Sequence, residues 1–247
     1  MRLTVVGAGP AYSDVVGAVG ACYLVRSGPH AIALDLGHGA FAGLAARIPP
    51  EQLDAIVISH LHPDHFVDLV PLRHYLWYHL SPAARVRVDA HRDLADRLDA
   101  LHAEPGFTAR ALDVVPLEPG VRDIGPFSVQ AARVTHTGDS FGFRVSEGSG
   151  GGLVYSGDVG RAADLAPLVR PGDTLLVEVS FGPGPVPPGA AHLDGPAVGA
   201  FASEAGAGRV LLTHLLMGRD RPATIQAVKD RFPGPVELVE PGFDTWI

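Results

Sequence analysis

Short apolar segments separated by glycine and proline run along the whole chain. The segment 55–58 is apolar at every position, a pattern typical of a strand buried on both faces. The segment 93–102 instead has apolar residues at helical spacing. On such patterns we predict strands at 1–7, 22–25, 31–34, 55–58, 85–88, 127–134, 141–145, 153–156, 175–179, 210–213 and 235–239. We predict helices at 40–48, 64–80 (with a kink at Pro71), 93–102, 197–205 and 222–231.

The order of these segments is strands, helix, strand, helix, and it occurs twice. This order predicts an α/β protein with two sheets and helices outside them, a four-layer αββα sandwich. No long linker separates the halves, and 247 residues suit one large domain. We therefore expect a single domain over residues 1–247.

Composition excludes several classes of protein. The chain has 19 basic and 27 acidic residues, a net charge of −8, so it lacks the bulk charge of a non-specific nucleic-acid binder. The lone Cys22 excludes an intrachain disulfide and a multi-cysteine zinc site, and it fits a cytoplasmic protein best. No apolar run reaches the ~18 residues of a membrane span, and residues 1–7 do not form an export signal.

Histidine is the unusual residue, with 12 copies. The run Ser59-His60-Leu61-His62-Pro63-Asp64-His65 follows the apolar strand at 55–58 and precedes a predicted helix. Side chains at the carboxyl end of a strand project into the crevice where α/β folds bind ligands. Imidazole and carboxylate are the donors that zinc, iron or manganese prefer. The run therefore predicts a metal site rather than a chance polar loop.

Later residues extend this site. His136, Asp158 and His214 each stand where a different apolar strand ends. One such residue alone would more often be structural, but three at strand ends point to one shared site. Together with the earlier run, they predict a centre for two metal ions.

This arrangement resembles the metallo-β-lactamase fold superfamily. Within it, the ribonuclease Z-like phosphodiesterases are most similar, because 136–144 resembles their histidine followed by a Ser-x-Gly-aromatic-Arg strand. The segments 176–180 and 191–194 resemble their glutamate strand and the start of their histidine-bearing helix. The short form, without a tRNA-binding arm, looks like the bacterial cyclic-nucleotide phosphodiesterases of the atypical class II type. The segment 215–220 differs from the Ile-Pro-Pro-Trp of that group.

The resemblance implies a role for each of these residues. His60, His62 and His136 would bind one metal, Asp64, His65 and His214 the second, and Asp158 would bridge both. Two divalent ions ~3.5–4 Å apart would generate a bridging hydroxide that attacks phosphorus. Zinc is the default metal, with manganese or iron as alternatives.

Three further residues have implied roles around the metals. Asp35 matches an early aspartate that orients the metal loop, although it could equally be a turn residue. His192 is the candidate proton donor to the leaving oxygen, and Glu178 would orient it. With Asp64, these two form the predicted catalytic set.

The substrate stays open between several classes. A small phosphodiester such as a cyclic nucleotide is favoured, and the alternatives are RNA 3′-end processing, thioester or lactone hydrolysis, or a specialised biosynthetic role. The Gly/Pro loop at 182–189 is either a lid or a connection. The aromatic cluster at 75–80 is either core packing, which we favour slightly, or a homodimer or base-stacking surface. No membrane partner is expected.

Overall fold

The apolar runs form strands in two sheets that pack face to face. The computed structural model describes residues 1–247. One sheet contains β1 (Arg2–Gly7), β2 (Cys22–Ser27), β3 (His30–Leu34), β4 (Ala55–Val57), β5 (Val86–Ala90), β6 (Leu112–Pro116) and β14 (Asp244–Trp246). The other contains β7 (Gly120–Ile124), β8 (Phe127–Val134), β9 (Ser140–Ser146), β10 (Leu153–Tyr155), β11 (Thr174–Glu178), β12 (Arg209–Thr213) and β13 (Val236–Leu238).

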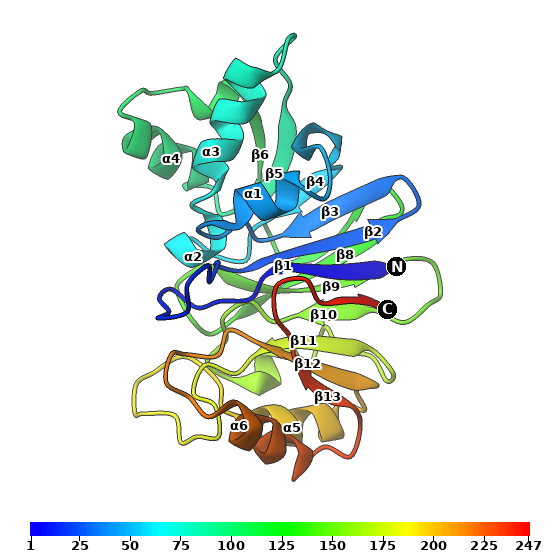
Figure 1. Cartoon of the computed structure of the whole chain (residues 1–247). Helices are drawn as coiled ribbons and strands as arrows, with labels where there is room; N and C mark the ends of the chain where they lie inside the picture. Colours follow the sequence, from blue (N-terminus) through cyan, green and yellow to red (C-terminus); the bar gives the residue numbers. More distant parts are fainter.

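Helices cover both outer faces of this sandwich (Figure 1). The helices are α1 (Ala40–Ala45), α2 (Pro63–Phe66), α3 (Leu69–His74), α4 (Leu94–His102), α5 (Gly195–Glu204) and α6 (Arg221–Lys229). The first four pack on the first sheet, and α5 and α6 pack on the second. The predicted four-layer αββα sandwich is therefore confirmed. None of these helices is long and apolar enough to cross a membrane.

Each sheet is built mostly from strands that are neighbours in the sequence. The first sheet has the order β14-β1-β2-β3-β4-β5-β6, and the second has the order β13-β12-β11-β10-β9-β8-β7. In β3, Ile32 and Leu34 face the other sheet, whereas Ala31 and Ala33 face the helices. Since side chains alternate between the two faces and both faces are covered, such strands are apolar throughout.

The helix predicted at 64–80 is three separate pieces. Helix α2 ends at Phe66, α3 begins at Leu69, and a π-helical turn, η2 (Tyr75–His79), follows. The break arises because the Asp68 N–H donates to the Leu36 carbonyl (3.1 Å). The predicted kink at Pro71 is also wrong. Pro71 lies in the first turn of α3, where its missing N–H costs no helical hydrogen bond.

The sequence interpretation missed strands at the sheet edges. Strands β6 and β7 were not predicted, and the chain closes with β14 rather than with the segment 235–239. Strand β14 pairs with β1 in the first sheet, so the two chain ends lie side by side (Figure 1). Edge strands such as β7 are largely exposed and therefore lack the apolar pattern that marks central strands.

The aromatic cluster at 75–80 is divided between core and surface. Leu76 is fully buried, and the Tyr75 ring packs against Phe41 with ring centroids 5.8 Å apart. Tyr78 is exposed, and Trp77 is 36% exposed. Core packing therefore accounts for part of the cluster, and the homodimer surface stays a prediction.

Candidate metal centre

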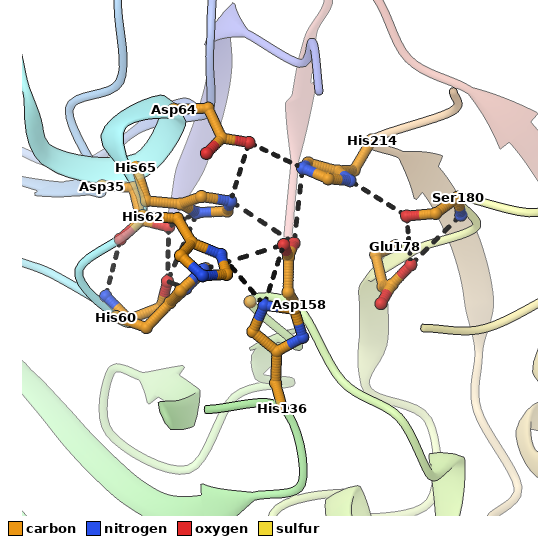
Figure 2. Close-up of polar contacts among 12 residues, drawn as sticks. Asp35, His60, His62, Asp64, His65, His136, Asp158, Glu178, Ser180 and His214 are labelled. Carbon is orange, nitrogen blue, oxygen red and sulfur yellow. Dashed lines mark hydrogen bonds and ion pairs between the residues drawn. The ribbon is translucent and has the colours of Figure 1, made fainter. Parts of the chain in front are cut away.

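The carboxyl ends of strands from both sheets meet at one edge of the sandwich. Strand β4 leads to His60 and His62, β8 to His136, β10 to Asp158 and β12 to His214. Figure 2 shows these side chains pointing toward one another around Asp158. Seven side chains form two groups whose ligand atoms lie within 4.8 Å of one another: His60, His62, His136 and Asp158, and Asp64, His65, Asp158 and His214.

The first group surrounds one carboxylate oxygen of Asp158. Asp158 Oδ2 lies 3.7 Å from His60 Nε2 and 3.6 Å from His136 Nε2. The His136 Nε2 and His62 Nδ1 atoms are 3.1 Å apart. Three imidazole nitrogens and one carboxylate oxygen thus converge on a single point.

The second group surrounds the other oxygen of the same carboxylate. Asp158 Oδ1 lies 3.3 Å from His65 Nε2 and 3.4 Å from His214 Nε2. Asp64 Oδ2 is 3.2 Å from His214 Nε2 and 3.6 Å from His65 Nε2. Asp158 therefore offers one oxygen to each group, as a bridging ligand must.

Hydrogen bonds from the far side of the imidazole rings fix which nitrogen faces the centre. His65 Nδ1 donates to Asp35 (2.7 Å), His136 Nδ1 to the Ala191 carbonyl (2.9 Å) and His214 Nδ1 to the Ser180 hydroxyl (3.0 Å). A neutral imidazole that donates through Nδ1 presents the lone pair of Nε2. These contacts therefore prepare the three rings to bind cations.

Unpaired buried atoms show that the residues fit metal ions. His60 Nε2, His65 Nε2 and Asp158 Oδ1 are buried and have no hydrogen-bond partner. Leaving such atoms unpaired costs free energy unless a ligand satisfies them. Histidine nitrogens and carboxylate oxygens are the donors that first-row divalent metals accept, so the two groups fit two divalent cations.

Asp35 supports His65, a member of the second group, from behind. Its carboxylate accepts hydrogen bonds from the Ser59 N–H (2.6 Å), the Ser59 hydroxyl (2.8 Å), His65 Nδ1 (2.7 Å) and the Tyr155 hydroxyl (2.6 Å). Asp35 and His214 both have left-handed backbone, with φ of 59° and 56°. Such conformations are costly for residues other than glycine and gather at functional sites.

Two buried residues of the cluster have strongly lowered pKa values. Burial alone would raise the pKa of Asp158, but His214 and His65 outweigh it and hold the pKa well below its usual range. Burial and the neighbouring His65 lower the pKa of His60 well below its ordinary value. Strongly shifted pKa values gathered in one place are characteristic of functional sites.

A buried glutamate and a histidine lie beside the second group. Glu178 accepts hydrogen bonds from His192 Nδ1 (2.9 Å), the Val159 N–H (2.9 Å) and the Ser180 hydroxyl (2.6 Å). The His192 ring stacks on the His214 ring, with centroids 5.9 Å apart. Burial disfavours the charged form of His192, but the hydrogen bond and charge of Glu178 outweigh burial and raise its pKa.

Two cavities flank the cluster. The larger, of about 410 Å³, is lined by His214, by residues 215–219 and by the loop 8–19. The smaller, of about 240 Å³, is lined by Leu61 and by the loop 137–139 next to His136. The larger cavity therefore reaches one residue of the cluster, His214, whereas the smaller is lined only by its neighbours.

Every residue that the sequence analysis placed in the site lies in or beside this cluster. The other histidines, at 30, 38, 74, 79, 91 and 102, belong to neither metal-binding group. Three hydroxyl residues that contact the site had no predicted role: Ser59, Tyr155 and Ser180. The only signal for them in the sequence is that each stands one to three residues from a predicted site residue.

Comparisons with known proteins identify the family of the chain. The model of the beta-lactamase superfamily domain matches residues 30–215. The uncharacterized protein Rv1339 of Mycobacterium tuberculosis is 33% identical over 97% of this chain and 89% of its own length. The protein YhfI of Bacillus subtilis is 27% identical over 98% of both chains.

Solved structures show the same fold. The crystal structure of YhfI, a metallo-beta-lactamase fold protein, has a TM-score of 0.88 over 99% of this chain and 98% of its own, at 24% identity. A diphosphatase of the PhnP family has a TM-score of 0.77 over 100% and 97%, at 18% identity. Human tRNase Z, short form, has a TM-score of 0.73 over 100% and 99%, at 21% identity. The family match, the near full-length relatives and the shared fold show together that the chain belongs to the beta-lactamase superfamily.

Proposed function

We propose that this chain is a dinuclear metal-dependent phosphodiesterase that hydrolyses small phosphodiesters such as cyclic nucleotides. The observation that carries the proposal is the Glu178–His192 pair beside the two ligand groups. Hydrolysis of a phosphodiester needs a proton on the leaving oxygen, and this pair is placed to deliver one. Asp64, Glu178 and His192 form the proposed catalytic set.

The two ligand groups would each hold one metal. His60, His62 and His136 would hold one cation, Asp64, His65 and His214 would hold the second, and Asp158 would take part in both sites. When bound, two divalent cations, zinc by default, supply positive charge for the phosphoryl oxygens and make a water molecule acidic enough to attack phosphorus. The histidine and carboxylate ligands would keep this positive charge in a fixed position while the substrate is bound.

His192 acts on the leaving group rather than on the attacking water. Its Nδ1 donates to Glu178, so in the charged ring Nε2 carries the proton that can be transferred. The raised pKa keeps a larger share of His192 protonated near neutral pH than an ordinary histidine would show. His192 therefore transfers its Nε2 proton to the leaving oxygen, and the buried carboxylate of Glu178 stabilises the charged ring before the transfer.

A turnover screen of the purified, metal-loaded protein tests the proposal. The substrates are bis(4-nitrophenyl) phosphate, cyclic AMP, a tRNA precursor, a thioester and a lactone, and the Asp64→Ala variant is the control. We expect turnover of phosphodiesters that the variant loses. Turnover of the carbonyl substrates alone would reject the phosphodiesterase and leave a metal-dependent hydrolase of another class. Turnover of the tRNA precursor alone would favour RNA 3′ processing instead.

A further inference from the structure

The larger cavity has an apolar wall and one unpaired cation. Val15, Val16 and Met217 line it and are largely exposed, with Leu215 between Met217 and His214. Arg219 lines the same cavity. A substrate held at the metal ligands would therefore extend past these residues.

Arg219 is fixed in position without a carboxylate partner. Its aliphatic stem packs on Gly182, where an added Cβ would lie 3.1 Å from the Arg219 Cβ. Its guanidinium lies 5.1 Å from the centroid of the Phe181 ring. No acidic side chain lies within ion-pair distance of it, in contrast to Arg221, which pairs with Glu240 (2.5 Å).

Neither Asp220, next in the sequence, nor Asp14, in the same cavity, pairs with Arg219. Asp220 caps helix α6 by accepting a hydrogen bond from the Ala223 N–H (2.9 Å). Asp14 also lines the cavity but makes no ion pair with Arg219. The guanidinium donors of Arg219 are thus available to a ligand, and a cation with free donors beside a cavity favours an anion.

Phe181 places Arg219 on the side of the proton donor. The Phe181 ring lies 6.1 Å from the His192 ring, measured between centroids. The Phe181 N–H donates to the carbonyl of Leu193 (3.0 Å), so the two aromatic residues are tied together. In the proposed reaction His192 faces the leaving oxygen. Because Arg219 lies on the same side, it faces the substituents of the leaving group.

We propose that Arg219 binds a second anionic group, a phosphate or a carboxylate, on the leaving-group side of the substrate. The assignment of sides rests on the proposed function. A guanidinium binds either anion through paired hydrogen bonds. Among small phosphodiesters, the inference favours those that carry a second anion over cyclic mononucleotides, whose only phosphate is the one that is cleaved.

Binding to the metal-loaded protein tests this site without turnover. The probes are phenyl phosphate, 3- and 4-carboxyphenyl phosphate and the matching phosphonophenyl phosphates, measured by isothermal titration calorimetry. We expect the wild type to bind the probes with a second anion more tightly than phenyl phosphate. Comparing the carboxylate probes with the phosphonate probes shows which anion the site prefers. In Arg219→Ala this preference falls about 10- to 100-fold. Arg219→Lys keeps part of it, since lysine retains the charge but loses the paired donors.

The matched control is Arg221→Ala, which removes the same charge from the same cavity and should leave the preference unchanged. A wild type without preference, or a preference that survives Arg219→Ala, overturns the inference. An equal loss in Arg221→Ala overturns it as well, because general charge would then explain the effect. Turnover of bis(4-nitrophenyl) phosphate judges the phosphodiesterase separately. Arg219-dependent binding without such turnover would keep the anion site and reject the proposed reaction.

Discussion

At the scale of single residues, His192 is the position at which proton transfer can be tested apart from metal binding. It contacts the metal-ligand rings but belongs to neither ligand group of the two metals. We expect His192→Ala to keep its metal content and to lose turnover by about 10²-fold or more. The loss should be smaller for a 4-nitrophenyl leaving group, which needs less protonation than an alkoxide. Metal analysis and steady-state kinetics with both kinds of leaving group measure these effects. Full activity of the variant would contradict the role of His192 as proton donor.

Tyr155 supports the centre through Asp35. Its hydroxyl donates to the carboxylate that also holds His65, so its removal should loosen the orientation of that ring. We expect Tyr155→Phe to weaken metal binding about 10-fold, measured by competition with a chelator. Tyr23→Phe is the control, because Tyr23 is equally buried and packs on Tyr155 but its hydroxyl contacts Thr213. Equal affinities of the two variants would contradict the role.

The ligands could be predicted from the sequence because each follows an apolar strand. The strand ends mark the edge of the sheet, and a histidine or aspartate at that edge has few structural reasons to be buried. Tyr155 carries no such mark. Its contact with Asp35 joins β10 of one sheet to the end of β3 in the other, and a single sequence does not reveal how two sheets pack. Ser180 links Glu178 to His214 across the ends of β11 and β12, and a single sequence does not reveal that these two strands are neighbours in one sheet.

At the scale of elements, α2 is held by backbone contacts rather than by its own length. The Asp64 carbonyl accepts from the Ala21 N–H (2.9 Å), and the His65 carbonyl accepts from the Leu36 N–H (2.8 Å). A four-residue helix has little stability of its own, so the loops around it fix the two ligands that it carries. This dependence explains why helical spacing alone overestimated the helix at 64–80.

Gly37 is the position where this packing is tightest. A Cβ at Gly37 would overlap the carbonyl oxygen of Asp64, so Gly37→Ala must displace α2. We expect a loss of about 1–3 kcal/mol in the free energy of unfolding, together with weaker binding of the second metal. Urea unfolding and metal analysis measure the two effects. Gly28→Ala, in a turn with open space around its Cβ, should keep its metals. Normal metal binding in Gly37→Ala would show that the loop adjusts.

At the scale of the whole molecule, the central strands were predictable, and so was the edge strand β13, but the edge strands β6, β7 and β14 were not. Central strands such as β4 are covered on both faces and therefore apolar, whereas β7 and β14 are mostly exposed. Inside the second sheet one ion pair is buried as well. Arg144, part of the strand that suggested the family, donates to Asp173 through Nε (2.7 Å) and Nη2 (2.9 Å). The pair joins β9 to the turn before β11.

This buried pair predicts how stability depends on pH. Burial tends to raise the pKa of Asp173, but Arg144 and two backbone N–H groups outweigh it and lower the pKa. A carboxyl whose pKa is lower in the folded state stabilises the fold above its unfolded pKa of about 3.9. That contribution is lost as the pH falls through the folded-state value. Asp173→Asn leaves the charge of Arg144 buried without a counter-charge, so we expect it to cost about 3 kcal/mol at pH 7.

Urea unfolding of wild type and Asp173→Asn between pH 3 and 8 measures the effect. The difference in free energy should be constant above about pH 5 and should shrink below about pH 4, because Asp173 of the unfolded wild type then takes up a proton. Asp113→Asn removes an exposed partner of Arg85 and should change stability by about 0.5 kcal/mol or less. A difference that does not shrink at all between pH 5 and pH 3 would show that the pair contributes through packing rather than through charge.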